Sequence, residues 1–217
     1  LDVSTEMEIV RQEARSSSVG GVVVRMPEFM EKVVSTISHL ARASNHVNQR
    51  SGVSVRLSVS NYELLAANAM RRALRAGEVD VAPRVSDLTA LAASTSGKIE
   101  IESVEEGRES AVLEQLVRAA VLQVYKQYVT SEKIRDVIAG FDEGIVVHAG
   151  DDVASVEYLT VLESIPGLRE IVVSIVKGDE SIAVIASAVE FVLEGLHLSK
   201  RLNKDSAGSR ATYSSRT

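Results

Sequence analysis

The chain has 217 residues, which is enough for one large domain or for two small ones that each bury a core. Hydrophobic residues make up 45% of it but include only three Phe, five Tyr and no Trp, so Val, Leu, Ile and Ala must fill the interior, as in packed helices. The net charge of -6 argues against a surface for nucleic acid or anionic lipid, and the absence of cysteine excludes disulfides, thiolate nucleophiles and cysteine-ligated zinc.

No apolar run approaches the roughly 20 residues of a membrane span, and the N-terminus lacks the basic and apolar segments of a signal peptide. We therefore expect a cytoplasmic protein with no membrane and no nucleic-acid partner. Because the first residue is Leu1 and a helical pattern begins soon after it, we also expect the chain to be a fragment of a longer protein.

Residues 1–97 are expected to form a small helical domain. A short helix over 4–15, with Thr5 and Glu8 at the spacing of a capping box, is followed by a Ser- and Gly-rich breaker and by the β-branched run 22–24. The next helix, over 27–43, carries apolar residues at three-and-four spacing, which predicts one buried stripe. The stripe consists of Met30, Val33, Val34, Ile37, Leu40 and Ala41.

A loop over 45–57 should turn the chain back into a second long helix. Ser60 and Glu63 have the spacing of a capping box for that helix, and Gly77 is expected to end it. Ser86 can cap a third, short helix before the polar stretch 94–97. We place a domain boundary near residue 97.

The second half, 98–202, is predicted to be a helical domain. Residues 98–102 alternate charge and Ile, as an exposed edge strand does, and an acidic link follows. Helices are expected at about 108–129, 131–139, 155–163, 167–176 and 179–202, with a turn over 140–152. Residues 203–217 are rich in Ser and Thr without periodicity, which predicts a disordered, mobile tail.

The usual signatures of catalysis are missing from the sequence. It contains no Gly-rich loop ending in Gly-Lys-Ser or Gly-Lys-Thr, no GxGxxG and no Gly-x-Ser-x-Gly, so a nucleotide grip or a serine hydrolase is not expected from this chain alone. His148 with Asp151 and Asp152 could be imagined as a metal site, but a solvated loop histidine is the simpler interpretation. The acidic pairs 105–106 and 142–143 indicate solvated links, and no catalytic or metal-binding residue is predicted.

One segment resembles a known family. The turn Ser51-Gly52-Val53-Ser54-Val55-Arg56 runs into the helix over 60–75, followed by Gly77-Glu78-Val79-Asp80-Val81 and Val85-Ser86-Asp87-Leu88. This arrangement resembles the lid domain of AAA+ ATPases of the MoxR and magnesium-chelatase type, in which a Gly-x-Ser-x-Arg turn opens the helix of the sensor 2 arginine. The resemblance implies that Arg56 contacts the γ-phosphate of ATP held by a neighbouring ATPase core. A surface arginine paired with a carboxylate is the alternative.

The resemblance covers residues 1–97, and the run 188–198 is similar to the C-terminal end of longer bacterial AAA+ proteins labelled magnesium chelatase. Val55 departs from the pattern, because many MoxR lids have proline before the sensor arginine. The Walker A and B motifs, sensor 1 and the arginine finger should lie upstream of Leu1, in a missing N-terminal ATPase core.

The implied fold is mainly α: an AAA+ lid-type helical bundle followed by a second helical region, with at most short strands. The resemblance implies an intact ATPase that uses ATP and Mg2+, forms a hexameric homo-oligomer and acts on a partner, often a protein with a von Willebrand A domain, for metal insertion or protein remodelling. This chain alone is not expected to be active.

Two alternatives remain at the level of the sequence. The chain could be a non-enzymatic helical module that binds another protein, which also explains the missing motifs. A DNA-binding regulator is a third interpretation, because Arg71, Arg72 and Arg75 cluster on one helix, although the chain is acidic overall.

Overall fold

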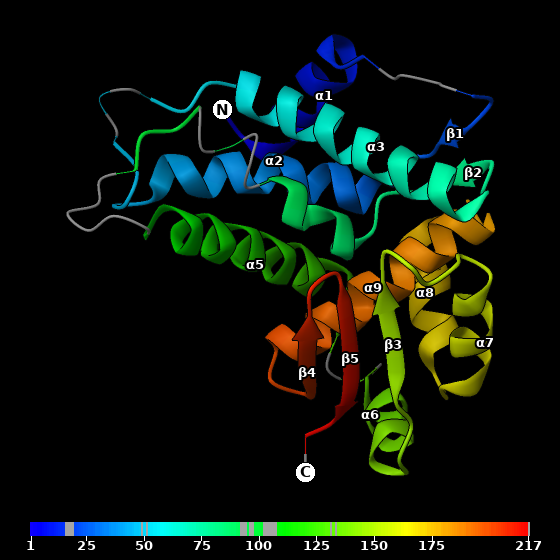
Figure 1. The fold of residues 1–217 in the computed structure, drawn as a ribbon. Coiled ribbons are helices and arrows are strands. Elements are labelled where there is room, and N and C mark those ends of the chain that lie inside the picture. The colour runs from blue at the N-terminus through cyan, green and yellow to red at the C-terminus, as the bar shows by residue number, and fades with distance from the viewer. Residues whose placement is uncertain are drawn as a thin grey trace.

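The computed structural model of the chain describes residues 1–15, 20–48, 50, 52–91, 95, 98–101, 108–130, 132 and 134–216. Helices make up most of this part and the strands are short, so the expectation of a mainly α fold with short strands is confirmed. Figure 1 shows α2, α3 and α5 side by side in the upper half, with a small sheet below them.

Three helices begin the fold: α1 (Val3–Glu13), α2 (Glu28–Ala43) and α3 (Arg56–Ala76). The carboxylate of Asp2 caps α1 by accepting a hydrogen bond from the Thr5 N–H at 2.8 Å. The predicted capping box of Thr5 and Glu8 is therefore not what begins this helix. The predicted stripe on α2 is confirmed for Met30, Val33, Val34, Ile37 and Ala41, which are each at most 1% exposed, whereas Leu40 is only partly buried.

Helix α3 begins at Arg56, four residues before the predicted capping residue Ser60. Val55 already has helical dihedral angles, φ -57° and ψ -20°, so the helix needs no side-chain cap at Ser60. The predicted end is confirmed, because Gly77 takes the left-handed conformation with φ 71° that glycine adopts without a steric cost.

A pair of very short parallel strands, β1 (Val23–Val24) and β2 (Asp80–Val81), lies near the end of α3. The 3-10 helix η1 (Val85–Ala90) follows β2. The prediction that Ser86 caps this helix is wrong: the Asp87 carboxylate accepts a hydrogen bond from the Arg84 N–H at 2.8 Å and fixes the first turn.

The second half contains the predicted helices with shifted ends, together with one strand that the prediction treated as part of a turn. These elements are α5 (Arg108–Tyr128), α6 (Arg135–Asp142), β3 (Val147–Gly150), α7 (Glu157–Ser164), α8 (Leu168–Val176) and α9 (Ile182–Leu198). Helix α9 is buried over almost its whole length, as expected for a helix that is apolar on all sides.

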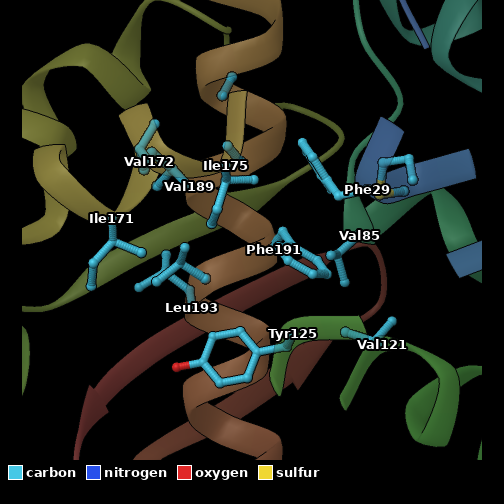
Figure 2. Close-up of a cluster of buried hydrophobic side chains, with 14 of the residues drawn as sticks. Phe29, Val85, Val121, Tyr125, Ile171, Val172, Ile175, Val189, Phe191 and Leu193 are labelled. Atoms are coloured by element: carbon cyan, nitrogen blue, oxygen red, sulfur yellow. The ribbon is translucent and has the colours of Figure 1, made fainter. Parts of the chain in front are cut away.

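The core joins the two predicted domains. Figure 2 shows Phe191 of α9 between residues from both halves of the chain. Its ring centroid lies 4.8 Å from that of Phe29 on α2 and 6.2 Å from that of Tyr125 on α5. One cluster of buried hydrophobic side chains extends from Phe29 to Tyr213. The boundary predicted near residue 97 therefore does not separate two cores, because α2 packs directly against α5.

The prediction of a mobile tail over 203–217 is wrong for the residues through 215. They form an antiparallel hairpin of β4 (Leu202–Ala207) and β5 (Arg210–Ser215), and β5 also pairs with β3, so the sheet has the order β3-β5-β4. Leu202 and Tyr213 are 1% and 2% exposed, so each strand anchors the hairpin on the core. Residue 217 lies outside the described residues.

None of the helices in the described ranges is both long and apolar enough to cross a membrane.

Candidate functional site

Arg56, the predicted sensor 2 residue, is exposed and is the first residue of α3. The hydroxyl of Ser54 accepts a hydrogen bond from the Arg56 N–H at 3.3 Å, so the Gly-x-Ser-x-Arg turn contacts the start of the helix. The Arg56 guanidinium forms no hydrogen bond or ion pair with any other residue that the structure describes. Its charge is therefore available to a group from outside this part of the chain.

Val55 stands where many MoxR lids have proline, yet its φ of -57° lies within the range that a proline ring imposes. The turn before Arg56 thus has the backbone geometry that proline would fix. The first N–H groups of α3 are satisfied within this turn, because the Arg56 N–H donates to the Ser54 hydroxyl and the Leu57 N–H donates to the Ser54 carbonyl oxygen at 3.0 Å.

The structure does not bring the residues of the imagined metal site together. The His148 Nδ1 atom lies 3.1 Å from the Thr212 hydroxyl, whereas Asp151 pairs with Arg75 at 3.3 Å and Asp152 pairs with Arg210. Among the residues whose placement is described, no group of three or more His, Asp or Glu side chains could hold a metal ion.

The other acidic pairs of the sequence do not form a site. Residues 105–106 lie outside the described residues. In the pair Asp142–Glu143, the Asp142 carboxylate accepts a hydrogen bond from the Ser215 hydroxyl, which ties α6 to the end of β5.

A buried network of charged side chains, which the sequence analysis missed, begins on α3. Arg72 and Asp87 are 1% and 0% exposed, and an Arg72 Nη2–H donates to the Asp87 carboxylate at 3.0 Å and to the Ala82 carbonyl oxygen at 2.8 Å. Asn68 donates to the other oxygen of Asp87 at 2.9 Å. Since both oxygens of Asp87 are engaged, this carboxylate holds η1 against α3. Arg72 is therefore not available to DNA.

The network continues from Arg84 to α9. The Arg84 guanidinium donates to the Val153 carbonyl oxygen at 2.7 Å and to the Ser155 hydroxyl at 2.6 Å, and it lies 4.7 Å from the centroid of the Tyr158 ring. The Tyr158 hydroxyl donates to the Glu190 carboxylate at 2.5 Å. The second oxygen of Glu190 accepts from the Ser86 N–H at 3.0 Å.

One helical turn further along α9, Glu194 forms a second buried acidic group. One of its oxygens accepts hydrogen bonds from the Lys204 ammonium at 2.7 Å and from the Tyr213 hydroxyl at 2.6 Å. Burial and the neighbouring carboxylates of Glu190 and Glu194 raise the pKa values of Tyr158 and Tyr213 well above the usual range. Both phenols therefore stay protonated and act as donors to the glutamates.

Glu190 and Glu194 line a cavity of about 450 Å³. Its wall is formed by α2, η1, α5, α9 and the β3-β5-β4 sheet. Apolar side chains supply a large share of this wall, among them Leu88 and Leu91 near η1 and Leu113, Val117 and Val121 on α5. The arrangement combines an apolar wall with two almost fully buried carboxylates, which are 2% and 4% exposed.

A signal for this second site was present in the sequence. Glu190 and Glu194 are the only charged residues between Ile182 and Leu196, and they lie four apart in an otherwise apolar run. Two charges on one face of a buried helix require buried partners. Those partners come from η1, α7 and the C-terminal hairpin, which no local pattern connects to α9.

No family model matches this chain, and neither a curated protein nor a solved structure was found to be similar to it.

Proposed function

We propose that this chain is the ATP-sensing lid and C-terminal region of an AAA+ ATPase of the magnesium-chelatase and MoxR type, with Arg56 as its sensor 2 residue. The observation that supports the proposal is the position of Arg56, exposed in the first turn of the 21-residue helix α3 and unpaired within the described part of the chain. A guanidinium there can form charge-assisted hydrogen bonds with phosphate oxygens, and the helix dipole adds to the attraction.

The residues of this chain fit only one part of an ATP site. The exposed guanidinium of Arg56 suits a phosphate, but the sequence has no Gly-rich phosphate loop. In the proposal, the remaining phosphate contacts and the ligands of Mg2+ come from a separate ATPase core. When ATP is bound at that core, its hydrolysis would supply the free energy for the movement.

The shared core suggests how a movement of α3, caused by contact between Arg56 and ATP, would be transmitted to the C-terminal region. Helix α2 packs against α3 on one side and against α5 on another, and α5 packs against α9. A displacement of α3 would therefore move these helices together rather than bend the chain near residue 97. In a homo-hexameric ring, this movement would act on a neighbouring subunit or on a partner with a von Willebrand A domain, for metal insertion or protein remodelling.

The test is ATP turnover by the full-length gene product that contains both the core and this chain. Arg56→Ala should lower turnover about 10- to 100-fold, because a hydrogen bond to a charged group contributes about 1.5–3 kcal/mol. Arg135→Ala is the matched control, since Arg135 is also an exposed first residue of a helix without a side-chain cap. The proposal would be contradicted if the unchanged protein and the two variants hydrolysed ATP at equal rates, or if the full-length gene product had no phosphate-binding loop.

A second function, a non-enzymatic helical module that binds another protein, has one specific observation in its favour. Leu74, Val23 and Val79 are 53%, 52% and 71% exposed. The Val23 N–H, in β1, donates a hydrogen bond of 2.8 Å to the carbonyl oxygen of Val79, the residue before β2. In this alternative, Val79→Asp would abolish partner binding while Arg56→Ala leaves it unchanged.

A further inference from the structure

We propose that the cavity between α5, α9 and the β3-β5-β4 sheet binds a small amphipathic cation, a primary amine or guanidine on an apolar body, whose charged group pairs with Glu194. This site contains neither Arg56 nor the start of α3, so it stands apart from the ATP-sensing proposal.

The size and wall of the cavity suit the apolar body of such a ligand. A volume of about 450 Å³ lies in the range of small-molecule sites, which runs from about 300 to 1,000 Å³. Leu113, Val117 and Val121 project from successive turns of α5 into the same wall, and Leu88 and Leu91 add apolar surface near η1. An aliphatic or aromatic group would be removed from water there.

The buried network itself is balanced in charge. Its carboxylates are Asp87, Glu190 and Glu194, and its basic groups are Arg72, Arg84 and Lys204. A cationic ligand would therefore add a charge-assisted hydrogen bond to Glu194 rather than complete a missing ion pair.

Glu194 also has hydrogen-bonding capacity left. The hydrogen bonds from Lys204 and Tyr213 both go to its Oε2 atom, and its Oε1 atom has no hydrogen bond to a described residue. The hydroxyl oxygen of Ser86, which also lines the cavity, is buried without a partner in the described part of the chain. An ammonium group has three donors and no acceptor, so it matches these oxygen atoms.

Among the residues that the structure describes, an anionic ligand finds no free cation in the same cavity. Of the basic residues in the wall, Lys204 pairs with Glu194, Arg118 pairs with Glu114 at 3.5 Å, and Arg210 pairs with Asp152. Binding a carboxylate or phosphate would require breaking one of these pairs. The site therefore discriminates by charge, and amphipathic cations are its ligand class.

The test is isothermal titration of the chain with three probes of equal apolar length: octylammonium, octanol and octanoate. Octylammonium should bind at least about tenfold more tightly than the other two, since a charge-assisted hydrogen bond separates it from them. Glu194→Gln should weaken octylammonium about tenfold or more. Glu31→Gln is the matched control, because Glu31 is a buried glutamate paired with Arg11 outside the cavity, and it should leave the affinity unchanged.

A second variant keeps the test decisive if Glu194→Gln does not fold. Val117 is only partly buried and lines the cavity, so Val117→Phe should fill space without removing a charge, and octylammonium should no longer bind. Folding of each variant is checked by circular dichroism. The proposal is overturned if octylammonium does not bind the folded chain, if the three probes bind equally, or if the folded variants bind like the unchanged chain.

Discussion

The contact between Gly195 on α9 and Tyr125 on α5 allows a quantitative prediction. A Cβ atom added to Gly195 would lie 2.1 Å from Cδ2 and 2.3 Å from Cγ of the Tyr125 ring, far inside normal contact distance. Tyr125 is 3% exposed, and Figure 2 shows its ring against α9. Only a residue without a side chain lets the two helices approach this closely.

Replacing Gly195 by alanine should therefore destabilise the fold. At an uncrowded helical position the same change would stabilise by about 1 kcal/mol, because alanine has the higher helix propensity. Overpacking a core typically costs about 1–3 kcal/mol, and the Tyr125 ring cannot turn away without disturbing Phe191, whose centroid is 6.2 Å from its own. We expect Gly195→Ala to lower the free energy of unfolding by about 1–3 kcal/mol.

Urea unfolding followed by far-ultraviolet circular dichroism measures this change. Gly140→Ala in α6 is the matched control, since its added Cβ would lie 3.1 Å from Pro166 Cδ and need only a small adjustment. Its free energy of unfolding should stay within about 1 kcal/mol of the unchanged chain. In a chain that already carries Tyr125→Leu, Gly195→Ala should lower the free energy of unfolding by less, because the ring that the added Cβ would meet is absent. A Gly195→Ala chain as stable as the original would refute the close packing of α5 on α9.

Three further changes test the buried network and the start of α3. Asp87→Asn should cost about 3–5 kcal/mol in urea unfolding, because it leaves the buried Arg72 without its nearest counter-charge; the exposed Asp179→Asn should change little, and equal effects would contradict this. Above pH 10 the fold should lose stability, because the raised pKa values of Tyr158 and Tyr213 keep these phenols neutral in the folded chain while the unfolded chain ionises them. The contribution is fully present below the usual tyrosine pKa of about 10 and is lost as the pH rises through the folded values. Tyr158→Phe should reduce the difference between the urea midpoints at pH 8 and pH 10.5. An unchanged difference would show that Tyr158 does not cause the loss of stability. Val55→Pro should stabilise by about 0.4–1 kcal/mol, since φ is already -57° and the Val55 N–H makes no hydrogen bond with another described residue; a large loss in a thermal melt would show that the turn before Arg56 differs.

Helical periodicity predicted most of the helices. The stripe on α2 and the apolar run of α9 were identified correctly because each repeats within a few turns, and a repeat of that length reflects which face leaves water. Helix starts were predicted less well. Candidate caps such as Ser60 and Ser86 were chosen by spacing alone, whereas Asp87 begins η1 because it also contacts Arg72 and Asn68 on α3.

The C-terminal hairpin escaped prediction for a related reason. Residues 203–215 carry mostly small and polar side chains, so their composition indicates disorder. They are ordered because β5 pairs with β3, more than 50 residues earlier in the chain, and because Tyr213 reaches Glu194 on α9.

The resemblance around Arg56 rested on neighbouring residues, and the exposure of Arg56 agrees with what that prediction requires without testing it. The cavity was beyond sequence reasoning. Its carboxylates could be noticed on α9, but their partners could not, since Ser86 and Glu190 are 104 residues apart.

The amino-acid order alone thus determined which segments become helices and which of their faces are buried, because those properties depend on the spacing of neighbouring side chains. Tertiary structure decided that one core spans both halves, that the C-terminal residues form strands, and that Glu190 and Glu194 line a cavity. These features depend on contacts between distant segments, whose free energy exists only once the chain has folded.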